Sequence, residues 1–143
     1  MKIAIASDHA GFDLKQRVVE HLGARGVDLG PPSADRVDYP DYAGAVARAI
    51  QQGEADFGVL VCGSGIGMAM AANRYAGVRA ALVHNAIAAR LSRQHNDAQI
   101  ICLGSRLIGE VVALEAIDAF LAADFEGGRH AGRVAKIHGP EQA

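Results

Sequence analysis

The stretch from Ala55 to Met68 constrains the fold more than any other part of the chain. It opens with a short apolar run, Phe57 to Val61, which is followed by Cys62 and by glycines at every second position. The residues from Met68 onward are strong helix formers. An apolar run, a glycine turn and a helix-forming segment in this order predict a buried strand, a tight turn and a helix.

The glycine turn places a thiol in a position suited to chemistry. Glycines at 63, 65 and 67 remove side chains where a backbone must turn sharply or approach a ligand closely. The helix that follows points its free N–H groups and the positive end of its dipole at the turn, which stabilises a thiolate at Cys62. The glycines alone fit a tight turn around an ordinary buried cysteine equally well. Cys62 and Ser64 together favour a reaction site.

Length and composition predict one domain that spans residues 1–143. About half of the residues are hydrophobic and a fifth are charged, as in an ordinary globular protein. A formal net charge of −2 argues against nucleic-acid binding. No apolar run approaches the ~20 residues that a membrane span needs. Two cysteines in a chain without an export signal predict free thiols and a cytoplasmic location.

The patterning along the chain alternates between strand and helix. Strands are expected at 2–7, 27–29, 57–61, 78–83 and 99–103, and helices at 12–25, 41–52, from 68, at 85–95 and at 108–123. Gly26 is expected to cap the first of these helices. Five strands that alternate with five helices indicate an α/β fold in which a parallel sheet is covered on both faces.

Polar side chains follow four of the expected strands. In a parallel sheet, ligands bind where the carboxyl ends of the strands meet, so we expect these side chains to share one rim. A carboxylate, imidazole, thiol, hydroxyl and guanidinium on one rim suit proton abstraction next to a carbonyl, or acyl or phosphoryl transfer. The residues are Asp8, His9, Cys62, Ser64, His84, Ser105 and Arg106.

Arginines favour an anionic substrate, because a guanidinium group matches the oxygens of phosphate and carboxylate. Arg106 lies on the expected rim, and Arg129 and Arg133 lie in the C-terminal segment. The four-residue spacing of Arg129 and Arg133 puts both on one face if that segment is helical. A solvated basic tail is the alternative.

The histidines show no spacing typical of a metal site. None of the six forms HxxxH, and the cysteines do not form CxxC, so we expect no metal. The glycine turn also lacks the patterns GxxxxGK[ST] and GxGxxG, so we expect no nucleotide cofactor.

His95 is expected at the C-terminal end of a helix. In a parallel α/β fold that end lies on the side away from the carboxyl ends of the strands. If His95 and Asn96 act at Cys62, they reach most simply into the site of a neighbouring subunit, which predicts a dimer with shared sites. The alternative is a helix cap, in which a charged His95 suits the dipole and Asn96 adopts a left-handed turn.

Several ordered motifs resemble those of the ribose-5-phosphate isomerase B family, which includes galactose-6-phosphate and allose-6-phosphate isomerases. The resemblance covers essentially the whole chain. The motifs are Ser7-Asp8-His9-Ala10-Gly11, Asp38-Tyr39-Pro40, Cys62-Gly63-Ser64-Gly65-Ile66-Gly67, Ser92-Arg93-Gln94-His95-Asn96-Asp97, Gly104-Ser105-Arg106 and Gly127-Gly128-Arg129-His130.

The resemblance implies a Rossmann-like, three-layer α/β/α sandwich with a five-stranded parallel sheet of order 2-1-3-5-4. It implies a homodimer, able to pair into a tetramer, with sites shared between subunits. It also implies interconversion of an aldose phosphate and a ketose phosphate, ribose 5-phosphate and ribulose 5-phosphate, with no metal or cofactor.

The same resemblance implies roles for individual residues. Cys62 would be the base that moves a proton between C1 and C2 through a cis-enediolate, assisted by Ser64. His95 would open the sugar ring, and Asp8 would hold or shuttle protons of the substrate hydroxyls. The residues that would bind the substrate and its phosphate are His9, Tyr42, Gly63, Gly65, Ile66, Gly67, Asn96, Arg106, Arg129 and Arg133.

The motifs leave other functions open. An isomerase of a tetrose or tetrulose phosphate would keep the same residues, and one extra carbon in a six-carbon phosphate changes pocket length rather than motif. A non-catalytic phosphosugar-binding subunit is disfavoured because Cys62, Asp8 and His95 are present together. A thiol hydrolase or redox protein is disfavoured by the absence of CxxC.

Overall fold

The computed structural model describes residues 1–139, in which five strands form one parallel sheet. The strand order is β2-β1-β3-β5-β4, which confirms the predicted topology. The strands are β1 (Ile3–Ser7), β2 (Gly26–Asp28), β3 (Phe57–Cys62), β4 (Ala80–Leu82) and β5 (Ile100–Gly104). The α-helices are α1 (Phe12–Leu22), α2 (Tyr39–Gln51), α3 (Ile66–Ala72), α4 (Ala86–Asn96), α5 (Glu110–Ala122) and α6 (Ala131–Ile137), and the 3₁₀ helices are η1 (Gly23–Arg25) and η2 (Gly128–His130).

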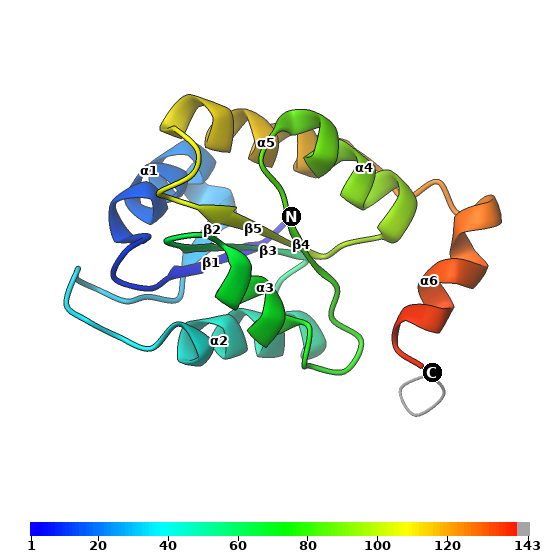
Figure 1. Ribbon diagram of the computed structural model, residues 1–143, viewed down its shortest axis with the longest axis horizontal. Helices are drawn as coiled ribbons and strands as arrows, with labels where there is room; N and C mark the ends of the chain where they lie inside the picture. The colour runs from blue at the N-terminus through cyan, green and yellow to red at the C-terminus, as the bar shows by residue number, and fades with distance from the viewer. Residues whose placement is uncertain (140–143) are drawn as a thin grey trace.

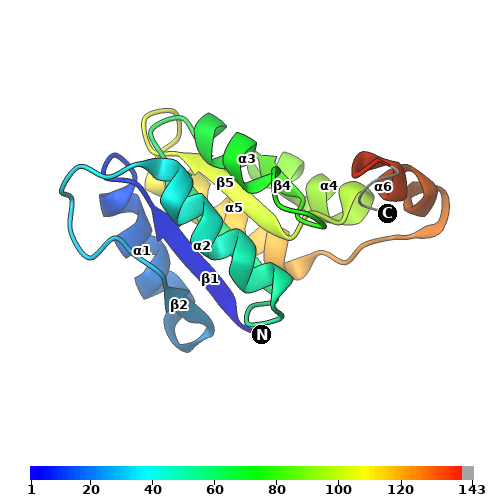
Figure 2. The same cartoon turned by 90° about the horizontal axis from the view of Figure 1, so that it is seen from below.

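Helices cover both faces of the sheet. Helices α1, α4 and α5 lie on one face, and α2 and α3 lie on the other (Figures 1 and 2). Strands β1 and β5 are buried along their whole length. Burial on both faces explains why the central strands read as continuous apolar runs rather than as alternating ones.

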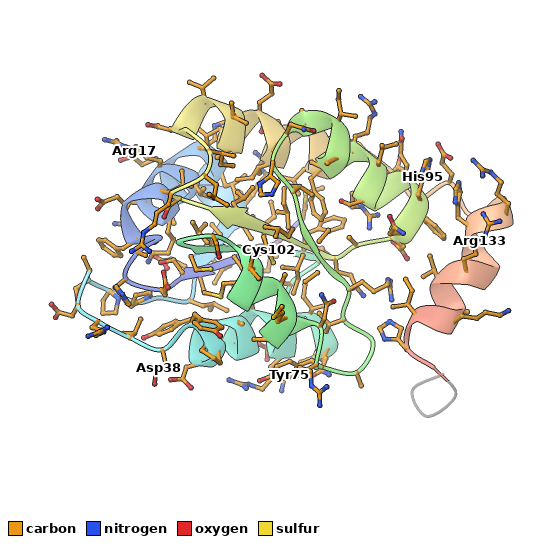
Figure 3. The ribbon with its side chains drawn as sticks, viewed as in Figure 1. Arg17, Asp38, Tyr75, His95, Cys102 and Arg133 are labelled. Atoms are coloured by element: carbon orange, nitrogen blue, oxygen red, sulfur yellow. The ribbon has the colours of Figure 1, made fainter. Side chains whose placement is uncertain are left out.

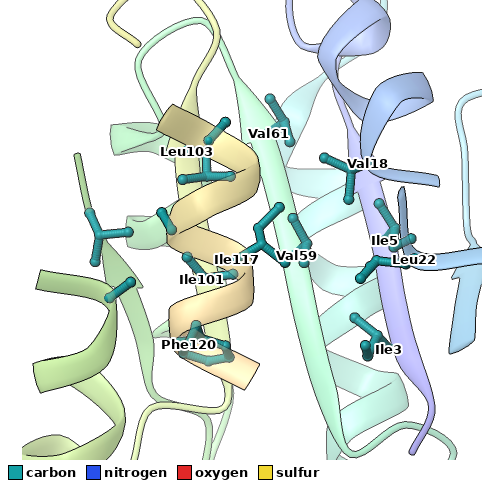
Figure 4. Packing of buried hydrophobic residues seen from close by; sticks show 14 of the residues in the cluster. Ile3, Ile5, Val18, Leu22, Val59, Val61, Ile101, Leu103, Ile117 and Phe120 are labelled. Carbon is teal, nitrogen blue, oxygen red and sulfur yellow. The ribbon is translucent and has the colours of Figure 1, made fainter. Parts of the chain in front are cut away.

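The two faces are packed with side chains of different size. On the α5 face, Val59 of β3 and Ile101 of β5 pack with Ile117 and Phe120 of α5 (Figure 4). On the α2 face the core uses many alanines. There Gly58 lets α2 approach β3 closely, because a Cβ at this position would lie 2.5 Å from the Cγ1 atom of Val46.

The first helix ends earlier than the sequence predicts. Helix α1 stops at Leu22, and the next residue, Gly23, has a φ of 55°, which a glycine adopts at little cost. The chain continues as η1 through Arg25, and Gly26 caps this 3₁₀ helix and is also the first residue of β2, with extended backbone. Its lack of a side chain matters there, because a Cβ would lie 2.8 Å from the Cδ1 atom of Ile5.

The C-terminal segment leaves the sheet and folds beside the end of α4 (Figure 1). It is helical in η2 and α6, and the side chains of Arg129 and Arg133 are exposed. Arg129 lies in η2 and Arg133 in α6. Among the described residues, no helix combines the length and apolar character needed to cross a membrane.

Candidate active site

The carboxyl ends of β1 and β3 and the loop after β5 surround a cleft of about 520 Å³. The parallel topology therefore brings together side chains that lie far apart in the sequence, as the strand-end pattern predicts. The predicted residues that line the cleft are Asp8, His9, Cys62, Gly63, Ser64, Ile66, Gly67 and Arg106.

Cys62 ends β3 and lies in the wall of the cleft, with 5% of its surface exposed. Its Sγ atom accepts a hydrogen bond from the N–H of Gly65 at 3.1 Å. Gly65 has a φ of 77°, so the turn that makes this contact needs a glycine. Both cysteines of the chain are free thiols, as predicted.

The loop after Cys62 also offers unused hydrogen-bond donors. The N–H of Ile66 donates to the Oγ atom of Ser64 at 3.2 Å. Within the part of the chain that the structure describes, the N–H groups of Ser64 and Gly67 have no hydrogen-bond acceptor. Because Ser64 and Gly67 line the cleft, these two groups can donate to a ligand oxygen.

The loop after β5 is fixed against the same turn. The N–H of Ser105 donates to the carbonyl oxygen of Cys62, and the N–H of Arg106 donates to that of Gly63, both at 2.9 Å. Gly104 permits this approach, since a Cβ there would lie 2.6 Å from backbone atoms of Ser64. The guanidinium group of Arg106 is thereby held over Gly63 at the cleft.

Asp8 and His9 follow β1 and complete the cleft. Asp8 is 7% exposed, and its Oδ1 atom accepts the N–H of Gly11 at 2.9 Å. The Nδ1 atom of His9 accepts the N–H of Val37 at 3.3 Å. In the neutral ring this hydrogen bond places the proton on Nε2, so His9 offers an N–H donor to a ligand.

Sequence reasoning missed Tyr39 and Met70, which also line the cleft. The ring of Tyr39 lies against Gly67, where a Cβ would come within 2.5 Å of it. The predicted helix starts at 41, whereas α2 starts at Tyr39, and the motif Asp38-Tyr39-Pro40 was the available signal. Tyr42 lies beside Gly30 and is not part of the cleft lining.

The remaining predicted site residues lie elsewhere. His95 and Asn96 are the last two residues of α4, which confirms the predicted placement of His95 near a helix end. Figure 3 shows His95 and Arg133 on the side of the molecule where α6 lies, away from Asp38 at the start of α2. None of His95, Asn96, Arg129 and Arg133 lines the cleft of its own chain.

The end of α4 is fixed by Asp97. This residue, and not Asn96, adopts the left-handed conformation, with a φ of 47°. Its carboxylate accepts a hydrogen bond from Arg93 at 2.8 Å and another from Arg79 at 3.2 Å. Because both arginine side chains are largely buried, the backbone that carries His95 is well anchored.

A second group of polar side chains surrounds His95. The N–H of Glu126 donates to the carbonyl oxygen of Gln94 at 3.0 Å, which brings the C-terminal segment to α4. The ring of His130 stacks on that of His95, with 4.3 Å between centroids and 14° between planes. Burial and the charge of Arg129 lower the pKa of His130 from its ordinary value.

Cys102 lies in the core and does not line the cleft. It is fully buried in β5, and this burial, with a smaller contribution from Cys62, raises its pKa far above the ordinary range of a thiol. An unreactive core thiol is what its place inside an apolar strand predicts.

Comparison with known proteins extends over nearly the whole chain. A family model described as Ribose/Galactose Isomerase matches residues 3–137. The chain is 49% identical to ribose-5-phosphate isomerase B of Escherichia coli, over 99% of this chain and 97% of the relative.

Solved structures agree with the sequence relatives. Ribose-5-phosphate isomerase B of Clostridium thermocellum has a TM-score of 0.96 and 46% identity, and the match covers 99% of this chain and 97% of that one. The enzyme of the same name from Mycoplasma genitalium, solved with bound ribulose 5-phosphate, has a TM-score of 0.91 and 45% identity, with 98% and 95% covered. The family model, the full-length relatives and the fold agree, and the chain therefore belongs to the ribose/galactose isomerase family and is an isomerase.

Proposed function

We propose that the chain interconverts ribose 5-phosphate and ribulose 5-phosphate through a cis-enediolate, without a metal or cofactor. The observation that carries this proposal is the position of the Cys62 thiol, which lines a cleft beside the unused N–H groups of Ser64 and Gly67. Membership of the family and the ribulose 5-phosphate bound to the relative from Mycoplasma genitalium support the choice of substrate.

Cys62 acts as the base in this mechanism. Its thiolate removes the proton from C2 of the open-chain aldose, and the same group returns a proton to C1 of the enediolate. Negative charge develops on the substrate oxygens during this transfer. The N–H groups of Ser64 and Gly67 stabilise that charge, because preorganised donors are most effective where charge appears in the transition state.

Asp8 handles the hydroxyl protons. Its Oδ1 atom is occupied by the N–H of Gly11, which fixes the carboxylate and leaves Oδ2 for the substrate. A carboxylate held in this way can accept a hydroxyl proton and return it as the carbonyl moves between C1 and C2. Its buried position next to the cleft supports this role.

The phosphate group is bound by donors from two chains. His9, through Nε2, and Arg106 lie at the cleft. Arg129 and Arg133 lie on η2 and α6, away from the cleft of their own chain, so we assign them to the site of a second copy. A homodimer in which each chain completes the other's site follows from this assignment.

His95 opens the furanose ring, and Asn96 lies beside it at the end of α4. Ring opening needs a proton on the ring oxygen and removal of one from the C1 hydroxyl, and an imidazole can do both. Like the arginines, His95 serves the cleft of the second copy, since it does not line that of its own chain.

The test follows both sugars by NMR in D₂O, with purified protein and excess EDTA. Rapid interconversion that starts from ribulose 5-phosphate is the expected result, with deuterium at C2 of the ribose 5-phosphate formed. Deuterium enters there because the base exchanges its proton with solvent before it returns one to carbon. A folded protein that leaves both sugars unchanged would contradict the proposal.

A further inference from the structure

Three side chains near the end of α4 form a group that the proposed reaction does not fully use. His95, Glu126 and His130 offer ligand atoms that all lie within 4.8 Å of one another. We call them the arm cluster, and we propose that it binds a divalent transition metal ion such as Zn²⁺. The cluster has no contiguous sequence motif, because α4 supplies one member and the C-terminal segment supplies the other two.

The distances within the arm cluster suit a small metal ion. Two imidazoles and a carboxylate are ligands that zinc takes in proteins, with bonds of about 2.0–2.2 Å, which puts neighbouring ligand atoms about 3.4 Å apart in a tetrahedral site. The Oε1 atom of Glu126 lies 3.5 Å from Nε2 of His130 and 3.8 Å from Nε2 of His95. The ring of His95 is stacked on that of His130 with 14° between planes, so it must rotate before both Nε2 lone pairs point at one ion. The His95 side chain is 36% exposed, which leaves room for this rotation.

His130 provides an independent indication of a ligand. The residue is 7% exposed, yet its Nε2 atom has no hydrogen-bond partner within the described residues. The contact with Glu126 brings the two atoms close without the geometry of a hydrogen bond. A buried nitrogen without a partner is costly, and a metal ion bound to its lone pair removes that cost.

The surrounding charges weaken cation binding, and the types of ligand select the metal. Arg129 and Arg133 lie close enough to His130 to influence its charge, and both repel a cation. Glu126 offsets this repulsion in part. Imidazole ligands then favour zinc, copper or nickel over magnesium or calcium, which prefer sites made of oxygen atoms alone.

Metal binding at the arm cluster has a consequence that rests on the proposed function. A bound ion occupies the Nε2 lone pair of His95, which then cannot exchange protons with a sugar ring. We therefore expect Zn²⁺ to inhibit turnover of cyclic ribose 5-phosphate reversibly, although catalysis itself needs no metal.

Binding is measured by calorimetry, with Zn²⁺ titrated into EDTA-treated and desalted protein. Glu126→Gln is expected to weaken binding by at least about tenfold, because an amide is a poor zinc ligand. His21→Gln is the matched control, since it removes a histidine that pairs with a carboxylate, Asp118, at 2.7 Å on another surface. Its affinity for Zn²⁺ should equal that of the unaltered protein.

Co²⁺ used in place of Zn²⁺ distinguishes this cluster from a thiol site. Ligation by nitrogen and oxygen gives visible d–d bands without the intense sulfur-to-cobalt charge-transfer band that Cys62 would add. The proposal is overturned if Zn²⁺ does not bind, if Glu126→Gln binds it as tightly as the unaltered protein, or if the Co²⁺ spectrum contains the thiolate band. None of these readouts requires turnover, so they separate failure of the metal site from failure of the isomerase proposal.

Discussion

The loops around Cys62 are joined to one another by backbone hydrogen bonds, whereas the segment that carries Glu126 and His130 extends away from the sheet. The N–H of Asp8 donates to Val61, and the loop after β5 donates twice to the turn after β3. The C-terminal segment is tied to α4 by the bond from Glu126 to Gln94 and by a stack of two histidine rings.

The glycines of the two regions show the same difference in how closely the chain is packed. At the cleft, Gly65 and Gly104 sit where a Cβ would collide with neighbouring strands or loops. In the C-terminal segment, Gly127 and Gly128 have positive φ, but a Cβ at either would meet no atom within 4 Å. The cleft is therefore a closely packed structure within one chain, while the C-terminal segment is an open one that a second copy can cover.

The largest expected effect tests the cleft. Cys62→Ala should lower the turnover number by about a thousandfold, because it removes the group assigned to proton transfer. Phosphate binding should survive, since no phosphate donor is changed. Turnover is measured by NMR, and binding by calorimetry with ribose 5-phosphate.

Cys102→Ala is the matched control for that variant. It removes the other thiol, which is fully buried in the core, and should lower the free energy of unfolding by about 1 kcal/mol while turnover stays normal. Near-normal turnover in Cys62→Ala would remove this thiol from the mechanism.

The next largest effect is expected at the end of α4, where the C-terminal segment packs. His95→Asn should lower turnover of ribose 5-phosphate by about a hundredfold, because the variant loses a general acid and base for ring opening. Erythrose 4-phosphate cannot close a furanose ring, so its turnover should fall much less. Equal losses on both substrates would argue against ring opening as the role of His95.

Mixing the two inactive variants tests whether the two regions meet across a dimer. If each site takes Cys62 from one chain and His95 from the other, refolding Cys62→Ala with His95→Asn in equal amounts restores one intact site per mixed dimer. Random pairing then gives about a quarter of normal activity, as expected for a symmetric dimer. A mixture that stays inactive, although mass spectrometry of the intact dimers detects mixed pairs, would place both groups in one chain's site.

The sequence predicts the cleft well, because parallel topology and strand ends decide which residues meet there. The sequence alone groups Asp8, Cys62 and Arg106, since each follows a predicted strand whose end faces the same rim, and all three line the cleft. Tyr39 was not found in this way, because it reaches the cleft from the start of a helix and not from the end of a strand.

The contacts of the C-terminal segment with His95 could not be predicted in the same way. Glu126 and His130 reach His95 through the path of an irregular segment, which depends on tertiary contacts and on positive φ at two glycines. Their spacing of four residues gives no signal for a partner on α4. Likewise, Gly23 and Gly26 both suit a helix end by residue type, and both end one, since α1 stops before Gly23 and η1 stops before Gly26.

The smallest expected effects compare one glycine from each region. Gly65→Ala combines backbone strain at a φ of 77° with a Cβ placed 2.6 Å from Leu82 and 2.9 Å from the backbone of Leu103, so it should cost about 3 kcal/mol of stability. Gly127→Ala has no collision, only the strain of a φ of 65° with a ψ of −130°, and should cost about 2 kcal/mol. Urea unfolding of both variants measures the difference. If Gly127→Ala costs as much as Gly65→Ala, the C-terminal segment is as closely packed as the cleft, and the contrast between the two regions fails.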